Sequence, residues 1–69
     1  MLYRIEFDVD NGATYTKDNA LVIASNPDEA EEKLRKFINY MDSETSVSEI
    51  FNISPYRGDI FTGLHGFTV

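Results

Sequence analysis

The sequence predicts a small α+β domain in which one helix packs on a mostly antiparallel sheet. Residues 2–10 alternate strictly between polar and apolar side chains, and Asn11-Gly12 follows them as a hairpin signal. The stretch after Pro27 carries apolar side chains at helical spacing. Two strands before the helix and two after it give the order ββαββ over residues 1–69, which we interpret as a single domain. The order of the strands within the sheet does not follow from the sequence.

The first expected strand, residues 2–10, is half-buried. Its apolar side chains are Tyr3, Ile5, Phe7 and Val9, and its polar ones are Arg4, Glu6, Asp8 and Asp10. Because successive side chains of a strand point to opposite faces, the first set should face the core and the second the solvent.

The second expected strand returns antiparallel to the first. Asn-Gly favours a two-residue type I′ turn, because both residues tolerate a positive φ. This turn would place Val9 opposite Thr14, Phe7 opposite Thr16 and Glu6 opposite Lys17. Residues 17–19 are where a bulge or bend in the returning strand would fall. Residues 20–24 are apolar on both faces, which is typical of a covered, central strand.

The helix start has several signals in a short span. Asn26 is the expected N-cap, Pro27 the first helical residue, and Glu29 is placed to close a capping box. The apolar stripe consists of Ala30, Leu34, Phe37, Ile38 and Met41. Three acid–base pairs at i,i+4 spacing are Glu29/Lys33, Glu31/Arg35 and Glu32/Lys36. The helix should end near Asp42, before a short polar loop.

Two further strands are expected after the helix. Alternation in the third places Val47, Phe51 and Ile53 on one face and Ile50 on the other. A turn is expected at residues 55–59 and a fourth strand at residues 60–69. Its two faces would carry Phe61, His65, Phe67 and Val69 on one side, and Ile60, Thr62, Leu64 and Thr68 on the other. Gly63 and Gly66 suggest a bulge or a close backbone approach within it.

The composition excludes several classes of function. Six Lys plus Arg against twelve Asp plus Glu give a net charge of −6, and there is no Cys. Without Cys there is no disulfide framework, thiolate nucleophile or Cys-based metal site. Direct binding to nucleic acid or to an anionic membrane needs a basic patch, so we expect neither. We expect a protein partner instead. No apolar run is long enough for a membrane span, and the N-terminus lacks the apolar stretch of a signal peptide, so a cytoplasmic protein is expected.

No motif for catalysis or metal binding is present. His65 is the only side chain that titrates near neutrality, yet no serine lies in a nucleophile-elbow context. We therefore interpret His65 as a strand histidine and predict no enzymatic activity; the alternative is an enzyme that uses His65, which His65→Ala would silence. Gly63-Leu64-His65-Gly66 follows the only expected helix, so it has no helix N-terminus to present to a phosphate. No metal and no cofactor are expected.

Acidic side chains are the first candidates for a partner-binding surface. Glu6, Asp8 and Asp10 repeat along one face of the first strand at roughly 6.6 to 6.8 Å per step, which resembles the charges of a nucleic-acid backbone. The acids of the helix start and of the loop after the helix could extend this row: Asp28, Glu29, Glu31, Glu32, Asp42 and Glu44. The alternative is that both groups are ordinary solvated surface and partners of the helix dipole.

Apolar side chains are the second candidates. Leu21, Ile23, Ile50, Ile60 and Leu64 fall on strand faces opposite to the expected core. A homo-oligomer with Ile50, Ile60 and Leu64 at its interface would cover them. A register slip at a bulge would account for the pattern without any partner. Tyrosines that could anchor an interface are Tyr15, Tyr40 and Tyr56; the alternative is that each completes an edge of the core.

The segment Ala20-Leu-Val-Ile-Ala-Ser-Asn-Pro-Asp-Glu-Ala-Glu-Glu-Lys-Leu34 resembles a pattern found in short proteins of bacteriophages and prophages. Those are small ββαβ-type domains, mostly of unknown function, so the resemblance transfers no site residues. It implies a phage origin, where small acidic proteins often bind and block a host enzyme or defence complex.

Together these observations predict a non-enzymatic acidic binding protein that modulates or inhibits a larger host protein. A nucleic-acid-binding protein is the partner that charge mimicry would suit. The expected partner-binding residues are Glu6, Asp8, Asp10, Asp28, Glu31 and Glu32. The alternative is a small homo-oligomeric structural module.

Overall fold

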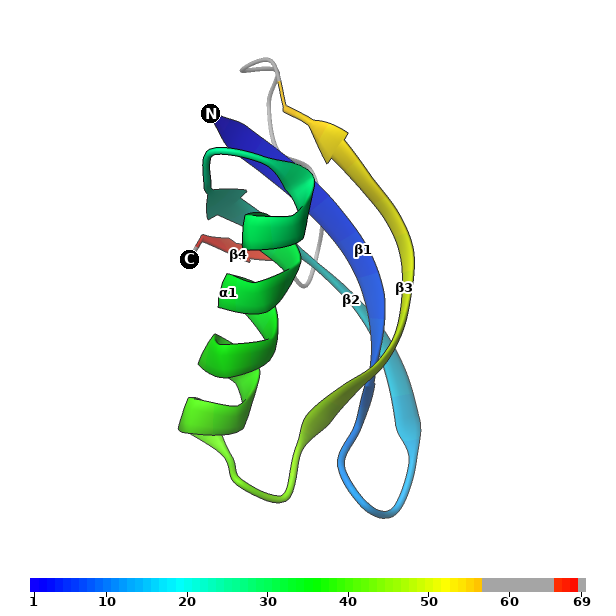
Figure 1. The fold of residues 1–69 in the computed structure, drawn as a ribbon. Coiled ribbons are helices and arrows are strands. Elements are labelled where there is room, and N and C mark those ends of the chain that lie inside the picture. The colour runs from blue at the N-terminus through cyan, green and yellow to red at the C-terminus, as the bar shows by residue number, and fades with distance from the viewer. Residues whose placement is uncertain (57–65, 69) are drawn as a thin grey trace.

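In the computed structural model, which describes residues 1–56 and 66–68, one helix packs on a sheet (Figure 1). The elements in chain order are β1 (Leu2–Asp10), β2 (Tyr15–Ile23), α1 (Pro27–Met41), β3 (Ser46–Pro55) and β4 (Gly66–Thr68). The α+β class with one helix on an antiparallel sheet is confirmed. Of the fourth strand expected at residues 60–69, the structure describes only β4, so Ile60, Leu64 and His65 lie outside the described residues.

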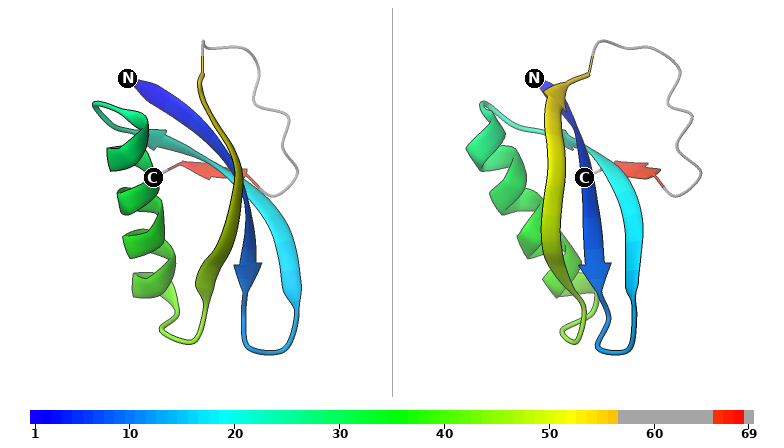
Figure 2. Two further views of the ribbon diagram at one scale, coloured as in Figure 1. Left: turned by 45° about the vertical axis from the view of Figure 1, so that its right-hand side comes forward. Right: turned by 90° about the vertical axis from the view of Figure 1, so that its right-hand side faces the viewer.

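The sheet has the order β3-β1-β2-β4. β1 pairs antiparallel with both β2 and β3, whereas β4 pairs parallel with β2. The N-terminal strand is therefore an interior strand of the sheet, and α1 lies along one face of it (Figure 2). The twist of the strands lets the sheet wrap around that side of the helix.

The alternation predicted for β1 is confirmed. Tyr3, Ile5 and Phe7 are buried on the face toward α1, and the polar residues between them are half-exposed on the opposite face. We call that opposite side the outer face of the sheet. β1 thus supplies both the centre of the core and the first candidate acids.

The hairpin register differs from the predicted one by two residues. Asp10 pairs with Tyr15, so the loop spans residues 11–14. The Asn11 side chain sets this longer loop, because its Oδ1 accepts the backbone N–H groups of Ala13 at 3.0 Å and Thr14 at 2.9 Å. Gly12 adopts a φ of 91°, a left-handed conformation that favours glycine. A shift of two residues keeps every side chain on its predicted face.

β2 runs without a bulge at residues 17–19, so the break considered there is absent. Its later half is an interior strand, as predicted, because Asn19–Leu21 also pairs with β4. Ala20 and Val22 are buried toward α1, and Leu21 is buried on the outer face. Ile23 remains 59% exposed, so the expected coverage of both faces does not extend to the end of the strand.

α1 begins and ends where the sequence predicted. The Asn26 Oδ1 accepts the Glu29 N–H at 2.8 Å, and Pro27 is the first helical residue. Glu29 Oε1 accepts the N–H of Ser25 at 3.3 Å, one residue before the N–H that a capping box would use. At the other end, the N–H of the C-cap Asp42 donates to the Ile38 carbonyl.

β3 contains two irregularities that reverse part of its predicted face pattern. Its register against β1 shifts between Glu6 and Phe7 and again between Asp8 and Val9. Each shift is a bulge that leaves one extra residue in β3, first Phe51 and then Ser48. Val47, Ile50 and Ile53 consequently pack on the core face.

Two predictions for β3 are therefore wrong. Ile50 was expected on the face opposite the core, yet it packs against the core cluster. Phe51 was expected beside Val47, yet it is 48% exposed. The bulge explanation for the surplus apolar residues is correct for Ile50, which removes one of the three expected oligomer contacts from the outer face.

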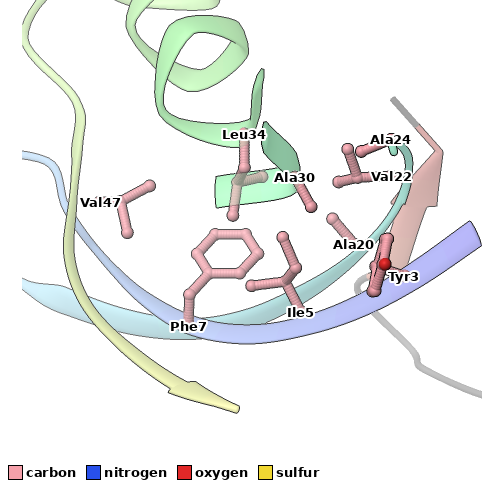
Figure 3. Close-up of a cluster of buried hydrophobic side chains, with 9 residues drawn as sticks. All are labelled: Tyr3, Ile5, Phe7, Ala20, Val22, Ala24, Ala30, Leu34 and Val47. Atoms are coloured by element: carbon pink, nitrogen blue, oxygen red, sulfur yellow. The ribbon is translucent and has the colours of Figure 1, made fainter. Parts of the chain in front are cut away.

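The core lies between α1 and the inner face of the sheet. Figure 3 shows Ile5 and Phe7 reaching from β1 toward Ala30 and Leu34 of α1. The cluster consists of Tyr3, Ile5, Phe7, Ala20, Val22, Ala24, Ala30, Leu34 and Val47. Small side chains from β2 let the helix approach the sheet closely, and the larger ones from β1 and α1 fill the space.

Candidate protein-binding surface

The acidic row of β1 lies on the outer face, but part of it is engaged within the chain. Glu6 forms an ion pair with Arg4 at 3.3 Å. Asp10 Oδ1 accepts the Gly12 N–H at 2.8 Å and so helps to hold the hairpin loop. Asp8 lies opposite Lys17 of β2 on one side and Glu49 of β3 on the other. The three acids therefore lie in one row along β1, but they differ in how far neighbouring groups engage their charge.

The acids of α1 are largely neutralised by their own helix. All three predicted i,i+4 pairs form, at 3.5 Å for Glu29–Lys33, 3.0 Å for Glu31–Arg35 and 2.8 Å for Glu32–Lys36. Lys36 lowers the pKa of Glu32 through a hydrogen bond and its charge, and the pKa of Lys36 is raised in return. Such exposed pairs contribute little stability, yet they reduce the charge that the helix presents.

The structure does not bring the two predicted groups of acids together. Glu6, Asp8 and Asp10 lie on the outer face of the sheet, while α1 covers the inner face. Asp28 lies in the first turn of α1, at the end of the molecule away from the hairpin loop (Figure 1). The six residues therefore do not form one surface.

A different concentration of acids appears at the end of the molecule that holds two loops. Residues 11–14, between β1 and β2, and residues 42–45, between α1 and β3, lie side by side in every view (Figures 1 and 2). We call this half of the molecule the acidic end. Its acids are Asp8, Asp10, Asp18, Asp42, Glu44 and Glu49. Within the described part of the chain, none of these six is in an ion pair shorter than 4.0 Å.

Among the described residues, few cations balance the acidic end. Lys17 lies across from Asp8, and its ammonium is 5.5 Å from the centre of the Phe51 ring on the outer face. The guanidinium of Arg35 is already shared between the carboxylate of Glu31 and the backbone carbonyl of Val47, both at 3.0 Å. The acidic end therefore retains a negative field, whereas ion pairs within α1 cancel most of the negative charge of the helix.

Asp42 is held in its charged form by the loop that follows it. Its Oδ1 accepts the Glu44 N–H and its Oδ2 accepts the Thr45 hydroxyl, each at 2.9 Å. These two hydrogen bonds lower the pKa of Asp42, the backbone bond having the larger effect. The carboxylate of Asp42 is thus fixed in position and ionised at neutral pH.

A hollow of about 490 Å³ opens at the acidic end between α1, β1 and β2. Its apolar walls are Val9, Phe37, Ile38 and Met41, and Asp18, Asp42 and Thr45 complete the lining. Met41 is 67% exposed although it belongs to the predicted apolar stripe of the helix. The stripe thus extends beyond the surface that the core covers.

Sequence reasoning missed Asp18 as a site residue. Asp18 lies opposite Phe7, so it occupies the face of β2 that points toward α1, in line with Ala20 and Val22. A carboxylate among side chains that face the core could have indicated a functional residue. It was missed because a bulge or bend was considered at residues 17–19, which would have left the direction of the Asp18 side chain undefined.

A second hollow of about 410 Å³ lies on the outer face, around Glu6, Lys17, Asn19 and the Phe51 ring. The exposed tyrosines Tyr15 and Tyr40 are not part of either hollow. Within the described residues no three His, Cys, Asp or Glu side chains are grouped to hold a metal ion. None of the helices in residues 1–56 and 66–68 has the length and apolar character needed to cross a membrane.

Comparison with known proteins gives no match: no family model, no curated protein and no solved structure is similar to the chain.

Proposed function

We propose that this chain is a non-catalytic binding protein that captures a larger protein through the acidic end. The observation that carries the proposal is the uneven charge: three of the four acids of α1 are paired with neighbouring cations, whereas none of the six at the acidic end is paired within the described residues. Uncompensated charge of one sign steers and orients a partner of the opposite sign. The partner surface is accordingly basic.

The proposal revises which of the predicted residues bind. Asp8 and Asp10 belong to the acidic end and remain binding residues. Glu6 is in an ion pair with Arg4, and Glu31 and Glu32 are in ion pairs within α1. Asp28 lies at the opposite end of the molecule. These four contribute to the overall charge and not to the contact.

Inhibition of a nucleic-acid-binding protein is the role that this surface suits best. Such a protein presents a basic groove, and an acidic surface that occupies it excludes the nucleic acid. The resemblance of residues 20–34 to phage proteins points the same way, with a host cell's cytoplasm as the place of action. The proposed effect is occupation of the partner's site, with no chemical step.

The experiment compares two variants with the same change in net charge. In the first, Asp8→Asn, Asp10→Asn and Glu44→Gln neutralise the acidic end. In the second, Asp28→Asn, Glu31→Gln and Glu32→Gln neutralise α1. Tagged protein captures partners from a cell extract, and the captured proteins are quantified by mass spectrometry. We expect the first variant to lose a partner that the wild type and the second variant retain.

Equal loss in both variants would contradict the proposal, because it would mean that only the total charge matters. Loss in the second variant alone would place the contact on α1. Thermal melts of both variants confirm that the comparison is between folded proteins.

A homo-oligomeric module is the second candidate function. It is favoured by two exposed apolar side chains, Ile23 at the end of β2 and Phe51 on the outer face of β3. The expected contacts Ile60 and Leu64 lie outside the described residues, and Ile50 packs on the core. Self-association is tested by the mass of the protein in solution.

A further inference from the structure

We infer that the hollow at the acidic end receives an apolar side chain from a partner segment that also carries Lys or Arg. This inference rests on the proposed function, because it specifies the chemistry of the basic surface that the acidic end captures. The occupant is an amphipathic basic segment of another protein, and it binds in the hollow at the acidic end.

The apolar walls of the hollow are the reason to expect an apolar side chain in the partner segment. Val9 and Ile38 pack against the edge of the core, while Met41 at the last turn of α1 is mostly exposed. A volume of about 490 Å³ lies within the ordinary range for sites that bury part of a ligand. Burial of aliphatic or aromatic atoms here removes apolar surface of both partners from water.

The two carboxylates at the hollow are the reason to expect Lys or Arg in the partner segment. Asp18 Oδ1 accepts the N–H of Asn19 at 2.8 Å, and within the described residues no cation lies within 4.0 Å of the carboxylate. Asp42 is held across the hollow by its bonds to Glu44 and Thr45. A carboxylate accepts more hydrogen bonds than either residue makes here, so each keeps capacity for an incoming ammonium or guanidinium group.

The combination selects against other occupants. An acidic segment would place like charges beside Asp18 and Asp42, and a purely apolar one would leave both carboxylates partly desolvated without a partner. A purely basic segment would gain charge contacts but leave the apolar walls in water. Only a segment with both features satisfies the whole lining.

The test uses three synthetic peptides and the full chain. The first peptide alternates leucine and lysine on opposite faces, the second replaces its leucines by serine, and the third replaces its lysines by glutamate. Binding is measured by fluorescence anisotropy, and the contact is mapped by NMR chemical shifts. We expect the first peptide to bind most tightly and to shift the amides of Val9, Met41 and Thr45.

Two pairs of variants locate the contact. Asp18→Asn should weaken binding of the first peptide about five-fold, while Asp28→Asn, with the same charge change at the other end, should leave it unchanged. Met41→Ser should weaken binding about ten-fold, while Tyr40→Ser, its neighbour in α1, should leave it unchanged. Tyr40 is 89% exposed and does not line the hollow, so the second pair isolates the apolar wall.

The outcomes separate this inference from the proposed function. If the first peptide binds and neither Asp18→Asn nor Met41→Ser weakens it, the hollow is not the docking point and the inference is overturned. In that case, loss of the peptide on neutralising Asp8, Asp10 and Glu44 would still support capture by the acidic end. Equal binding of the first two peptides would also overturn the inference, because the apolar walls would then contribute nothing. If no lysine-bearing peptide binds and the extract yields no charge-dependent partner, both proposals fail.

Discussion

The oxygens of three side chains fix the points at which the chain changes direction. Asn11 Oδ1 accepts two backbone N–H groups in the hairpin loop, and Asn26 Oδ1 accepts one at the start of α1. Asp42 accepts a backbone N–H and a hydroxyl in the loop after α1. Each oxygen satisfies donors that a loop or helix end would otherwise leave to water, so each residue defines a boundary of an element.

Asn26→Ala is the first prediction at this scale. Loss of the amide oxygen leaves the Glu29 N–H without its capping acceptor, so the free energy of unfolding should fall by about 1 kcal/mol. Urea denaturation followed by circular dichroism measures the change. Ser25→Ala is the matched control, because Ser25 contributes its backbone N–H to the helix start. A stability for Asn26→Ala equal to that of the control would contradict the capping role.

Thr45→Val is the second prediction at this scale. The variant removes the hydroxyl that donates to Asp42, so the pKa of the Asp42 carboxyl should rise toward its ordinary value. An NMR titration of that carboxyl measures the shift, and Ser43→Ala is the control. An unchanged pKa in Thr45→Val would mean that the hydroxyl does not act on Asp42.

The lowered pKa also sets the direction of a pH effect. A carboxyl whose pKa is lower in the folded than in the unfolded state stabilises the fold at pH values above about 4. This contribution is lost as the pH falls through the lowered pKa of Asp42. Thr45→Val should therefore lose less stability than the wild type on acidification.

The elements differ in how much of them the sequence could predict. The limits of α1 were predictable because Asn26, Pro27 and the i,i+4 pairs are local signals. The hairpin register was not, because Asn-Gly also fits a longer loop in which the Asn11 side chain replaces a backbone acceptor. In β3 the bulges at Ser48 and Phe51 follow from pairing with a distant strand, and alternation alone cannot indicate them.

Ile50→Ala compared with Phe51→Ala tests the face pattern of β3. Ile50 packs against the core, so its truncation should lower the free energy of unfolding by about 2 kcal/mol. Phe51 is half-exposed beside Lys17, so its truncation should cost no more than about 1 kcal/mol. Strict alternation predicts the reverse order. Chemical denaturation of the two variants decides between the two patterns.

At the scale of the whole molecule, charge is distributed by topology. The sequence showed which residues are acidic but not that Asp10 and Glu44 belong to the same end, because their loops meet only when β1 and β3 pair. It showed the apolar stripe of α1 but not that Met41 would remain exposed beside Asp18. The candidate site thus forms only in the assembled fold. Its acidic and apolar residues could be identified from the sequence, but their closeness in space could not.

The solution mass tests the whole-molecule alternative. With a net charge of −6 opposing self-association and Ile50 packed on the core, we expect a monomer of 7.9 kDa at both low and high salt. Light scattering across salt concentrations measures this mass. A dimer or larger assembly that persists at high salt would instead establish the homo-oligomeric module, because apolar contacts resist salt and charge contacts do not.

The interior position of β1 also bears on how the chain folds. Asp10 meets Tyr15 after a short loop, whereas it meets Ser46 only when the whole of α1 has been enclosed between them. Closing the larger loop costs more chain entropy, so the β1–β2 hairpin and α1 should form early and β3 should dock after them. The docking step also brings the loop that holds Asp42 and Glu44 up to the hairpin. The negatively charged surface should therefore be complete only after β3 has docked, so this docking step would govern when the protein becomes able to bind.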